Sequence, residues 1–326
     1  MSATQNSGAQ PLVVIPADHP PLVALSPRLH ALHEFARVKL HTDRPQGDDE
    51  KVRRLADAEI LLNSRGSLKI PQSVIERLPR LKMIAVCGIG YDSIDLQAAR
   101  KQNIVVCNVP GRTRTVVAEH AFGLMLAVSR RMAWMTSELH AGHWRGDLGI
   151  SLIGKQIGVI GTGNIGLEMI RLCRAFGMTV VAWSFHPDPA RATELGFLYV
   201  ELDELLRTSD VVSLHPRLSD QTRGLIGARE LALMKSSAIV INTARGAMID
   251  TPALVDALHG GRLFGAGLDV FDQEPLLPDH PILNCPNVVL TPHTADQTQE
   301  GIDAVTQGCV DNIVAFLNGQ PQNVVS

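Results

Sequence analysis

Short runs of β-branched and apolar residues alternate with amphipathic segments along most of the chain, and this alternation constrains the fold more than any other feature. Strands separated by helices are joined by crossovers and lie parallel, so the pattern predicts an α/β protein with parallel sheets. In the N-terminal part, strands are expected at 11–16, 36–41, 58–64, 82–88 and 104–110, with helices at 71–79 and 95–103.

A second alternating series begins at residue 156. Six strands are expected at 156–160, 179–183, 210–215, 238–244, 264–271 and 287–293, with helices at 164–177, 201–209, 228–235 and 251–261. Six such strands with intervening helices fit a doubly wound sheet. Residues 115–144 lack proline and carry apolar residues at helical spacing, which predicts one long helix or two abutting helices. Residues 298–319 predict a further amphipathic helix with no strand after it.

The length and composition favour a two-domain globular protein. A chain of 326 residues is long for a single core, and 45% apolar with 19% charged residues is an ordinary globular balance. The net charge of −3 comes without clusters of Lys and Arg, so we expect no nucleic-acid partner.

The five cysteines form no closely spaced pair and lie mostly in apolar runs, which favours buried free thiols over disulfides or a metal site. The N-terminal segment lacks the basic region and long apolar run of a signal peptide. No apolar run approaches the roughly 20 residues of a membrane span. We therefore expect a soluble cytoplasmic protein that binds no membrane and no metal.

Glycines at positions 161, 163 and 166 follow a buried strand in the spacing G-x-G-x-x-G. Gly161 would allow a tight turn, Gly163 would let a pyrophosphate approach the backbone, and Gly166 would let helix and strand pack closely. The helix starting at Asn164 and Ile165 would then present free N–H groups to the phosphates. An ordinary strand–helix turn and an S-adenosylmethionine site are the alternatives.

The next strand ends in Ser184, Phe185 and His186, where an NAD site usually carries a carboxylate for the adenosine ribose. Without that carboxylate nothing at Ser184 repels a 2′-phosphate, and Arg191 lies a little further on. The cofactor is therefore expected to be NADP or NAD, with NADP favoured and dual use as the alternative.

Three side chains suited to acid–base and carboxylate chemistry follow later strands, namely Arg245, Glu274 and His293. A guanidinium can bind a carboxylate by two parallel hydrogen bonds, and a histidine oriented by a carboxylate can transfer a proton. Each has a plainer interpretation, as a strand-end cap, a solvated turn or an ordinary histidine. Ligands bind beyond the carboxyl ends of parallel strands, where all three side chains are expected to lie. Taken together, the three side chains favour an enzyme that reduces a 2-keto acid.

With these residues in place, the chain resembles the D-isomer-specific 2-hydroxyacid dehydrogenases, and the resemblance implies a glyoxylate or hydroxypyruvate reductase or a broad 2-keto-acid reductase. Four blocks carry the resemblance: AVCGIGYDSIDL at 85–96, GVIGTGNIG at 158–166, INTARGAMID with ALVDAL at 241–258, and GLDVFDQEPL with LTPHTA at 267–295. The resemblance implies a Rossmann cofactor domain at 115–296, inserted into a flavodoxin-like substrate domain formed by 1–114 and 297–326. It also implies a homodimer.

Carried over by position, the resemblance assigns Arg245 to substrate binding, His293 to proton transfer and Glu274 to orienting that histidine. Backbone N–H groups at Ile89 and Gly90 would receive the substrate carboxylate. The implied cofactor-binding residues, with the glycine turn and Ser184–His186, are Val117, His215, Pro216, Thr243, Ala244, Asp269 and His293.

The chain also departs from the family pattern. Pro216 and Arg217 stand where many members read Leu-x-Pro-Leu, and Asp296 follows the histidine block. Arg112 and Arg114 have no assigned role. Formate dehydrogenases carry Gln where this chain has Glu274, which sets them aside. A short phosphoglycerate dehydrogenase and a nicotinamide-sensing binding protein, like the transcriptional corepressors of this fold, remain the alternatives.

Overall fold

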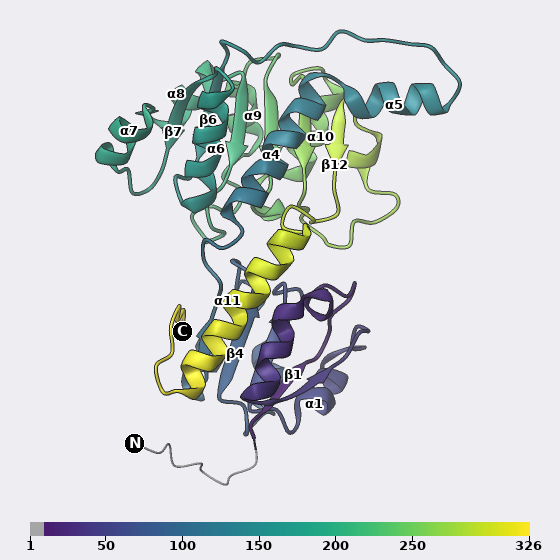
Figure 1. The fold of residues 1–326 in the computed structure, drawn as a ribbon. Coiled ribbons are helices and arrows are strands. Elements are labelled where there is room, and N and C mark those ends of the chain that lie inside the picture. Colours follow the sequence, from purple (N-terminus) through teal and green to yellow (C-terminus); the bar gives the residue numbers. More distant parts are fainter. Residues whose placement is uncertain (1–9) are drawn as a thin grey trace. The chain divides into compact units, whose positions relative to one another are not determined.

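The chain forms two compact units in a computed structural model that describes residues 10–326. Unit 1 comprises Met1–Thr113 and Gln297–Ser326, and unit 2 comprises Arg114–Asp296. The chain therefore leaves unit 1 once and returns to it once (Figure 1). The expectation about a signal peptide falls partly on residues 1–9, which lie outside the described residues.

Unit 1 is built on a five-stranded, wholly parallel sheet in the order β2-β1-β3-β4-β5. This is the flavodoxin-like order, and each of the five predicted strands is present. The strands are β1 (Leu12–Ile15), β2 (Arg37–Leu40), β3 (Ile60–Ser64), β4 (Met83–Cys87) and β5 (Val105–Cys107).

The central strands of unit 1 are buried on both faces, which explains why they read as continuous apolar runs. In β4, Met83, Ala85 and Cys87 enter one core, and Ile84 and Val86 enter the other. One core is closed by η1 (Val23–Leu25), η2 (Pro27–Glu34) and α11 (Gln299–Leu317), the other by α1 (Asp48–Leu55), α2 (Gln72–Ile75) and α3 (Leu96–Lys101). The sequence pattern did not predict η2 or α1, because α1 is mostly charged and η2 is a 3-10 helix.

Unit 2 is built on a seven-stranded parallel sheet in the order β12-β11-β10-β9-β6-β7-β8. The strands are β6 (Gln156–Ile160), β7 (Thr179–Trp183), β8 (Leu198–Tyr199), β9 (Val211–Leu214), β10 (Ile239–Asn242), β11 (Gly265–Leu268) and β12 (Val288–Leu290). Six strands were expected in this unit, and that number was wrong because β8 was missed. This strand has only two residues, too few to show a periodicity in the sequence. The strand order reverses between β6 and β9, the point where doubly wound sheets bind ligands.

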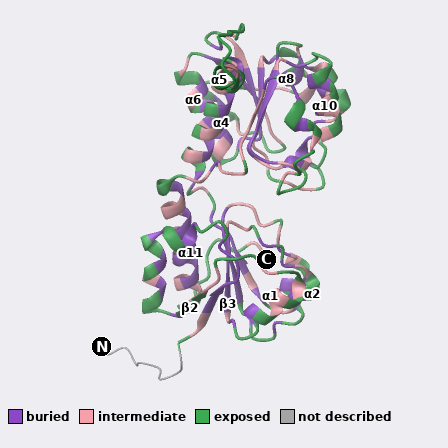
Figure 2. Ribbon diagram, turned by 90° about the vertical axis from the view of Figure 1, so that its right-hand side faces the viewer, coloured by how far each residue is buried: buried purple, intermediate pink, exposed green. Residues whose placement is uncertain are grey.

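Helices cover both faces of this sheet, and Figure 2 shows the buried strands between helices whose outer sides are exposed. They are α4 (Arg114–Ser129), α6 (Asn164–Ala175), α7 (Pro189–Leu195), α8 (Leu202–Thr208), α9 (Ala228–Leu233) and α10 (Thr251–His259), with η3 (Gly246–Met248) and η4 (Pro281–Asn284). The segment 115–144 forms two helices, because the left-handed backbone of Arg131 separates α4 from α5 (Met132–His140).

The five cysteines are all buried and free, as predicted. Burial raises the pKa of the Cys107 thiol to about 11 and that of Cys173 to about 12, so both stay protonated at neutral pH. Among residues 10–326, no helix is both long and apolar enough to cross a membrane.

Candidate active site

The glycine turn after β6 has the geometry that its three glycines predict. Gly161 has φ +90°, and a Cβ there would lie 2.7 Å from the backbone nitrogen of Pro216. A Cβ on Gly166 would lie 2.0 Å from the Gly161 carbonyl oxygen, so only glycine lets α6 approach the turn this closely. A Cβ on Gly163 would meet nothing within 4 Å, which leaves the open approach that a pyrophosphate needs.

Two further observations fit a dinucleotide at this turn. Helix α6 begins at Asn164 without a side-chain cap, so the N–H groups of its first turn, including that of Ile165, suit an anion. The Thr243 hydroxyl, beyond the end of β10, is buried and has no hydrogen-bond partner among the described residues. A buried hydroxyl without a partner is costly, and a bound polar ligand would relieve that cost.

The loop after β7 is organised by its own polar side chains. The Ser184 hydroxyl accepts a hydrogen bond from the His186 N–H at 3.2 Å, and the Trp183 and Phe185 rings pack edge to face at 4.7 Å. Asp188 caps α7 by accepting from the backbone N–H of Arg191 and pairs with the Arg191 side chain at 3.1 Å. Asp188, whose carboxylate is the nearest to Ser184 in the sequence, therefore already has a hydrogen-bond partner and an ion-pair partner.

His215 and Pro216 lie beyond β9, beside Gly161. His215 Nε2 is 2.8 Å from the Ser213 hydroxyl, and burial lowers the pKa of His215 to about 4. The imidazole is therefore neutral at neutral pH and adds no positive charge to this edge of the sheet.

Arg245, Glu274 and His293 follow the neighbouring strands β10, β11 and β12 at their carboxyl ends. Since the three strands are parallel neighbours, the three side chains come to one edge of the sheet, although Arg245 and His293 are 48 positions apart in the sequence. His293 Nδ1 lies 2.7 Å from Glu274 Oε2, and the other carboxylate oxygen accepts the Phe271 N–H at 3.0 Å.

The charge on Glu274 is stabilised by this arrangement. Burial by itself would raise the pKa of the carboxyl, but the hydrogen bond and charge of His293, the Phe271 N–H and the charge of Arg245 lower the pKa of Glu274 overall. Glu274 is therefore ionised at neutral pH and able to hold His293 with Nδ1 protonated. His293 has φ +54°, a left-handed backbone of the kind that is concentrated at functional sites.

Asp269 lies at the end of β11 and is completely buried. Its carboxylate accepts hydrogen bonds from the Thr291 hydroxyl at 2.6 Å and from the backbone N–H groups of Thr294 at 2.8 Å and Ala295 at 2.9 Å. Burial opposes ionisation, but these donors and His120 lower the pKa of Asp269 overall. Asp269 therefore holds the loop that carries His293.

His120 and Thr291 extend this network, and the sequence did not single out either. His120 Nε2 lies 2.9 Å from the Thr291 hydroxyl oxygen and 3.5 Å from Asp269 Oδ1. Because Thr291 donates its only hydroxyl proton to Asp269, Nε2 of His120 must be the donor to Thr291. A histidine inside the helical pattern of 115–144 gave no sign of this contact.

The loop carrying Arg245 is tied to its own strand. Asn242 donates to the Arg245 carbonyl at 2.9 Å and accepts from the Ala244 N–H at 3.0 Å, and Arg245 Nη1 donates to the Ala244 carbonyl at 2.8 Å. A Cβ on Gly246 would lie 1.9 Å from the Phe271 carbonyl carbon, so the loops after β10 and β11 pack backbone to backbone.

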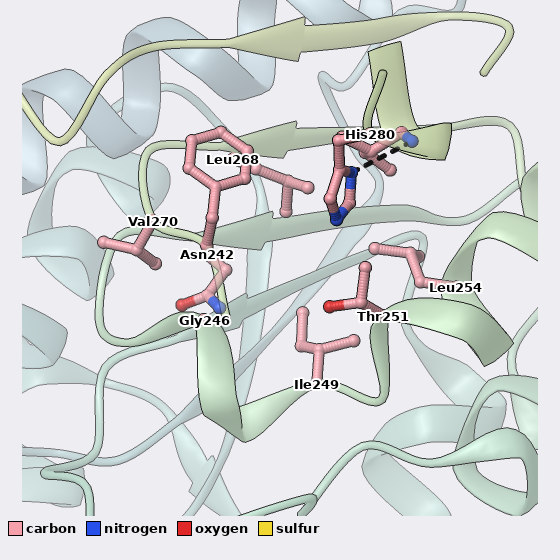
Figure 3. Close-up of a pocket in the computed structure, with 10 residues that line it drawn as sticks. Asn242, Gly246, Ile249, Thr251, Leu254, Leu268, Val270 and His280 are labelled. Atoms are coloured by element: carbon pink, nitrogen blue, oxygen red, sulfur yellow. Dashed lines mark hydrogen bonds between the residues drawn. The ribbon is translucent and has the colours of Figure 1, made fainter. Parts of the chain in front are cut away.

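A small cavity lies under these loops (Figure 3). Most of its lining is apolar, and His280 accepts the Ile282 N–H at 3.2 Å on one side. Its volume of about 10 Å³ has room for about one water molecule, so it accommodates neither a dinucleotide nor a keto acid.

The other residues named from the sequence are spread over both units. Val117 is buried on the first turn of α4 in unit 2, where Arg114 begins the helix and Asp296 is the last residue of the unit. In unit 1, Ile89 and Gly90 lie in the loop after β4. Arg112, to which the sequence assigned no role, forms an ion pair with Asp311 of α11 at 2.8 Å.

Comparison with known proteins agrees with these features. Residues 122–295, which lie within unit 2, match the family described as D-isomer specific 2-hydroxyacid dehydrogenase, NAD binding domain. A glyoxylate reductase of Thermococcus litoralis is 39% identical over 287 residues, covering 85% of each chain. A hydroxypyruvate reductase of Thermotoga maritima is 41% identical over 274 residues, covering 82% of this chain and 88% of that protein.

Solved structures share the same fold. The structure of an acyclic imino acid reductase in complex with NADPH and D-arginine superposes with a TM-score of 0.87 at 29% identity, covering 97% of this chain and all of that one. The matched NAD-binding region, the two parallel sheets and relatives covering most of the sequence lead to one assignment. This chain belongs to the family of D-isomer-specific 2-hydroxyacid dehydrogenases.

Proposed function

We propose that the protein reduces a small 2-keto acid to the D-2-hydroxy acid, and catalyses the reverse oxidation, with NADP(H) or NAD(H). Glyoxylate and hydroxypyruvate are the favoured substrates, because reductases named for them are 39% and 41% identical to this chain. The observation that carries the proposal is the 2.7 Å contact between His293 Nδ1 and Glu274 Oε2, on a sheet edge that also carries Arg245.

A bound nicotinamide would supply the hydride for the keto carbon. Glu274 occupies Nδ1 of His293, so Nε2 is the nitrogen that gives its proton to the substrate oxygen. When Nε2 has lost its proton, Nδ1 still donates to Glu274 and the ring keeps its orientation. The Arg245 guanidinium binds the substrate and stabilises the negative charge that develops on the oxygen.

Further binding roles are proposed for residues of each unit taken by itself. In unit 2, the glycine turn and the start of α6 suit the pyrophosphate, and the unpaired Thr243 hydroxyl suits a polar group of the cofactor. In unit 1, the N–H groups of Ile89 and Gly90 are proposed to bind the substrate carboxylate.

NADPH is proposed as the preferred cofactor. Ser184 stands where a carboxylate would repel a 2′-phosphate, and Asp188 is engaged by the first turn of α7 and by Arg191. The test compares kcat/KM for NADPH and NADH on one keto acid, and a strong preference for NADH would contradict the assignment. Ser184→Asp should then favour NADH, because its carboxylate would repel the 2′-phosphate.

Turnover tests the proposed function directly. Oxidation of NADPH or NADH is followed with glyoxylate, hydroxypyruvate and phenylpyruvate, and the product is analysed for the D-enantiomer where it is chiral. Cofactor binding without oxidation on any of these acids would contradict the proposal and support a nicotinamide-sensing binding protein instead.

Replacing Glu274 with Gln should move the alkaline limb of the kcat/KM profile for reduction to lower pH by about one unit. Reduction needs protonated His293, and the Glu274 carboxylate favours that protonated form. Without the negative charge at position 274, the positively charged ring loses the partner that now stabilises it, so activity declines earlier as the pH rises. Glu194→Gln, on the exposed side of α7, is the matched control. An unmoved limb in Glu274→Gln would remove Glu274 from this role.

A homodimer through the α5 region is also proposed. Helix α5 has no buried residue, and it extends from the body of unit 2 in Figure 1. Trp144 and Leu148, in the segment that follows it, are 95% and 87% exposed, and Leu139 is 52% exposed. An apolar surface of this kind favours burial against a second copy. Sedimentation should give about twice the chain mass of 35.3 kDa, and Trp144→Ser with Leu148→Ser should reduce it to that of one chain.

A further inference from the structure

The N–H groups of Ile89 and Gly90, which are proposed to bind the substrate carboxylate, belong to two successive peptide units. The carbonyl oxygens of both units accept hydrogen bonds from the short segment 108–109. The Gly88 carbonyl accepts from the Val109 N–H at 2.8 Å, and the Ile89 carbonyl accepts from Asn108 Nδ2 at 2.7 Å. In a trans peptide the C=O and the N–H point in opposite directions within one plane. The N–H groups of Ile89 and Gly90 are therefore directed away from the segment 108–109.

Asn108 is itself held on both of its backbone groups. Its carbonyl accepts from Asn312 Nδ2 of α11 at 2.7 Å, and its N–H donates to the Asn323 carbonyl at 3.2 Å. Asn323 Nδ2 in turn donates to Asn312 Oδ1 at 2.8 Å. Asn312 is completely buried and Asn108 is 7% exposed, so water is poorly placed to compete for these amides.

Packing along β5 leaves this segment little freedom. A Cβ on Gly308 of α11 would lie 2.5 Å from Val109 Cγ1, so the helix contacts the segment as closely as glycine allows. The Val325 N–H donates to the Val106 carbonyl at 2.8 Å, which extends the sheet edge with residues of the C-terminal segment. Asn108 is thus a rigid support rather than one end of a mobile loop.

We propose that Asn108 is a positioning residue for substrate binding: its side-chain amide fixes the peptide plane that presents the Gly90 N–H to the carboxylate of the keto acid, and Asn312 and Asn323 fix Asn108. The proposal rests on the proposed function, because it assumes that the Ile89–Gly90 loop binds that carboxylate. All of its contacts lie within unit 1, whereas the glycine turn lies in unit 2. The network therefore affects binding of the keto acid and leaves binding of the cofactor unchanged.

The test replaces Asn108 with Asp, which keeps the shape and puts an oxygen where Nδ2 donates, and with Ala, which removes the donor. Both variants should raise KM for glyoxylate or hydroxypyruvate by about fivefold to tenfold, the effect of one misplaced hydrogen bond, with kcat within about twofold. The inhibition constant of oxamate, an unreactive carboxylate, should rise in parallel. The dissociation constant for NADPH should stay unchanged.

Two further variants separate positioning from loss of folding. Asn312→Ala should raise KM for the keto acid in the same direction by a smaller factor, because it acts through Asn108. Asn318→Ala, at the exposed end of the same helix, should change nothing and is the matched control. Hydrogen exchange at the β4 amides reports whether unit 1 remains folded in each variant.

The outcomes distinguish this inference from the proposed function. If the unsubstituted protein turns over no keto acid, the proposed function fails. If it does turn over, and Asn108→Asp leaves both KM for the keto acid and oxamate inhibition unchanged, the inference is overturned. Equal rises in KM for the keto acid and in the NADPH dissociation constant would also overturn it, since they would indicate a general structural effect.

Discussion

Replacing His293 with Gln is expected to lower kcat for reduction by about two to four orders of magnitude. Gln can occupy a similar volume, but its amide cannot give up a proton to the oxygen of the keto acid. Glu274 keeps its hydrogen bond from the Phe271 N–H in this variant, so the loop after β11 should stay in place. The measurement is single-turnover reduction of glyoxylate or hydroxypyruvate, which isolates the chemical step from product release.

The control for this variant is His259→Gln, at the exposed end of α10 in the same unit. It should leave kcat unchanged. A loss of less than about tenfold in His293→Gln, with its NADPH affinity intact, would show that another group or water delivers the proton.

Replacing Arg245 with Lys is expected to lower kcat/KM for the keto acid by about two to three orders of magnitude. Lysine keeps the positive charge but loses the planar fork that can bind a carboxylate with two hydrogen bonds and also reach the developing oxyanion. It also loses the Nη1 bond to the Ala244 carbonyl that orients the side chain. Initial rates over a range of keto acid concentrations separate the effects on kcat and KM.

Arg223→Lys provides the matched comparison, because Arg223 is exposed in the loop between β9 and α9. This substitution should be neutral. Retention of most of the activity in Arg245→Lys would mean that charge alone, without the guanidinium geometry, is sufficient at this position.

The sequence predicted most of the fold because its information is local. Most strands are short apolar runs, and the burial of both sheet faces explains why those runs are continuous, whereas β2 alternates exposed Arg37 and Lys39 with Val38 and Leu40. The two-residue strand β8 and the charged helix α1 were missed, since neither contains enough apolar positions to show a period. For residues 115–144 the pattern left one long helix or two abutting helices open, and the left-handed backbone of Arg131 separates them into α4 and α5.

The candidate site could be predicted as a set of residue types but not as a set of contacts. Position after parallel strands predicted that Arg245, Glu274 and His293 share one sheet edge, and in the structure His293 Nδ1 lies 2.7 Å from Glu274 Oε2. Asp269 was expected at the cofactor from its position, and the structure adds a contact that the position did not predict: its buried carboxylate accepts hydrogen bonds from the loop that carries His293.

The sequence by itself determined the features that depend on short-range chemistry. These are the positions of most strands and helices, the need for glycine at positions 161 and 166, and the side chains that follow parallel strands. What the tertiary structure alone decided is which distant groups meet. His120 reaches Thr291 across 171 positions, and Asn312 reaches Asn108 across 204. A hydrogen bond requires its two groups within about 3 Å and in line, and only packing of the complete unit brings such distant residues to that geometry.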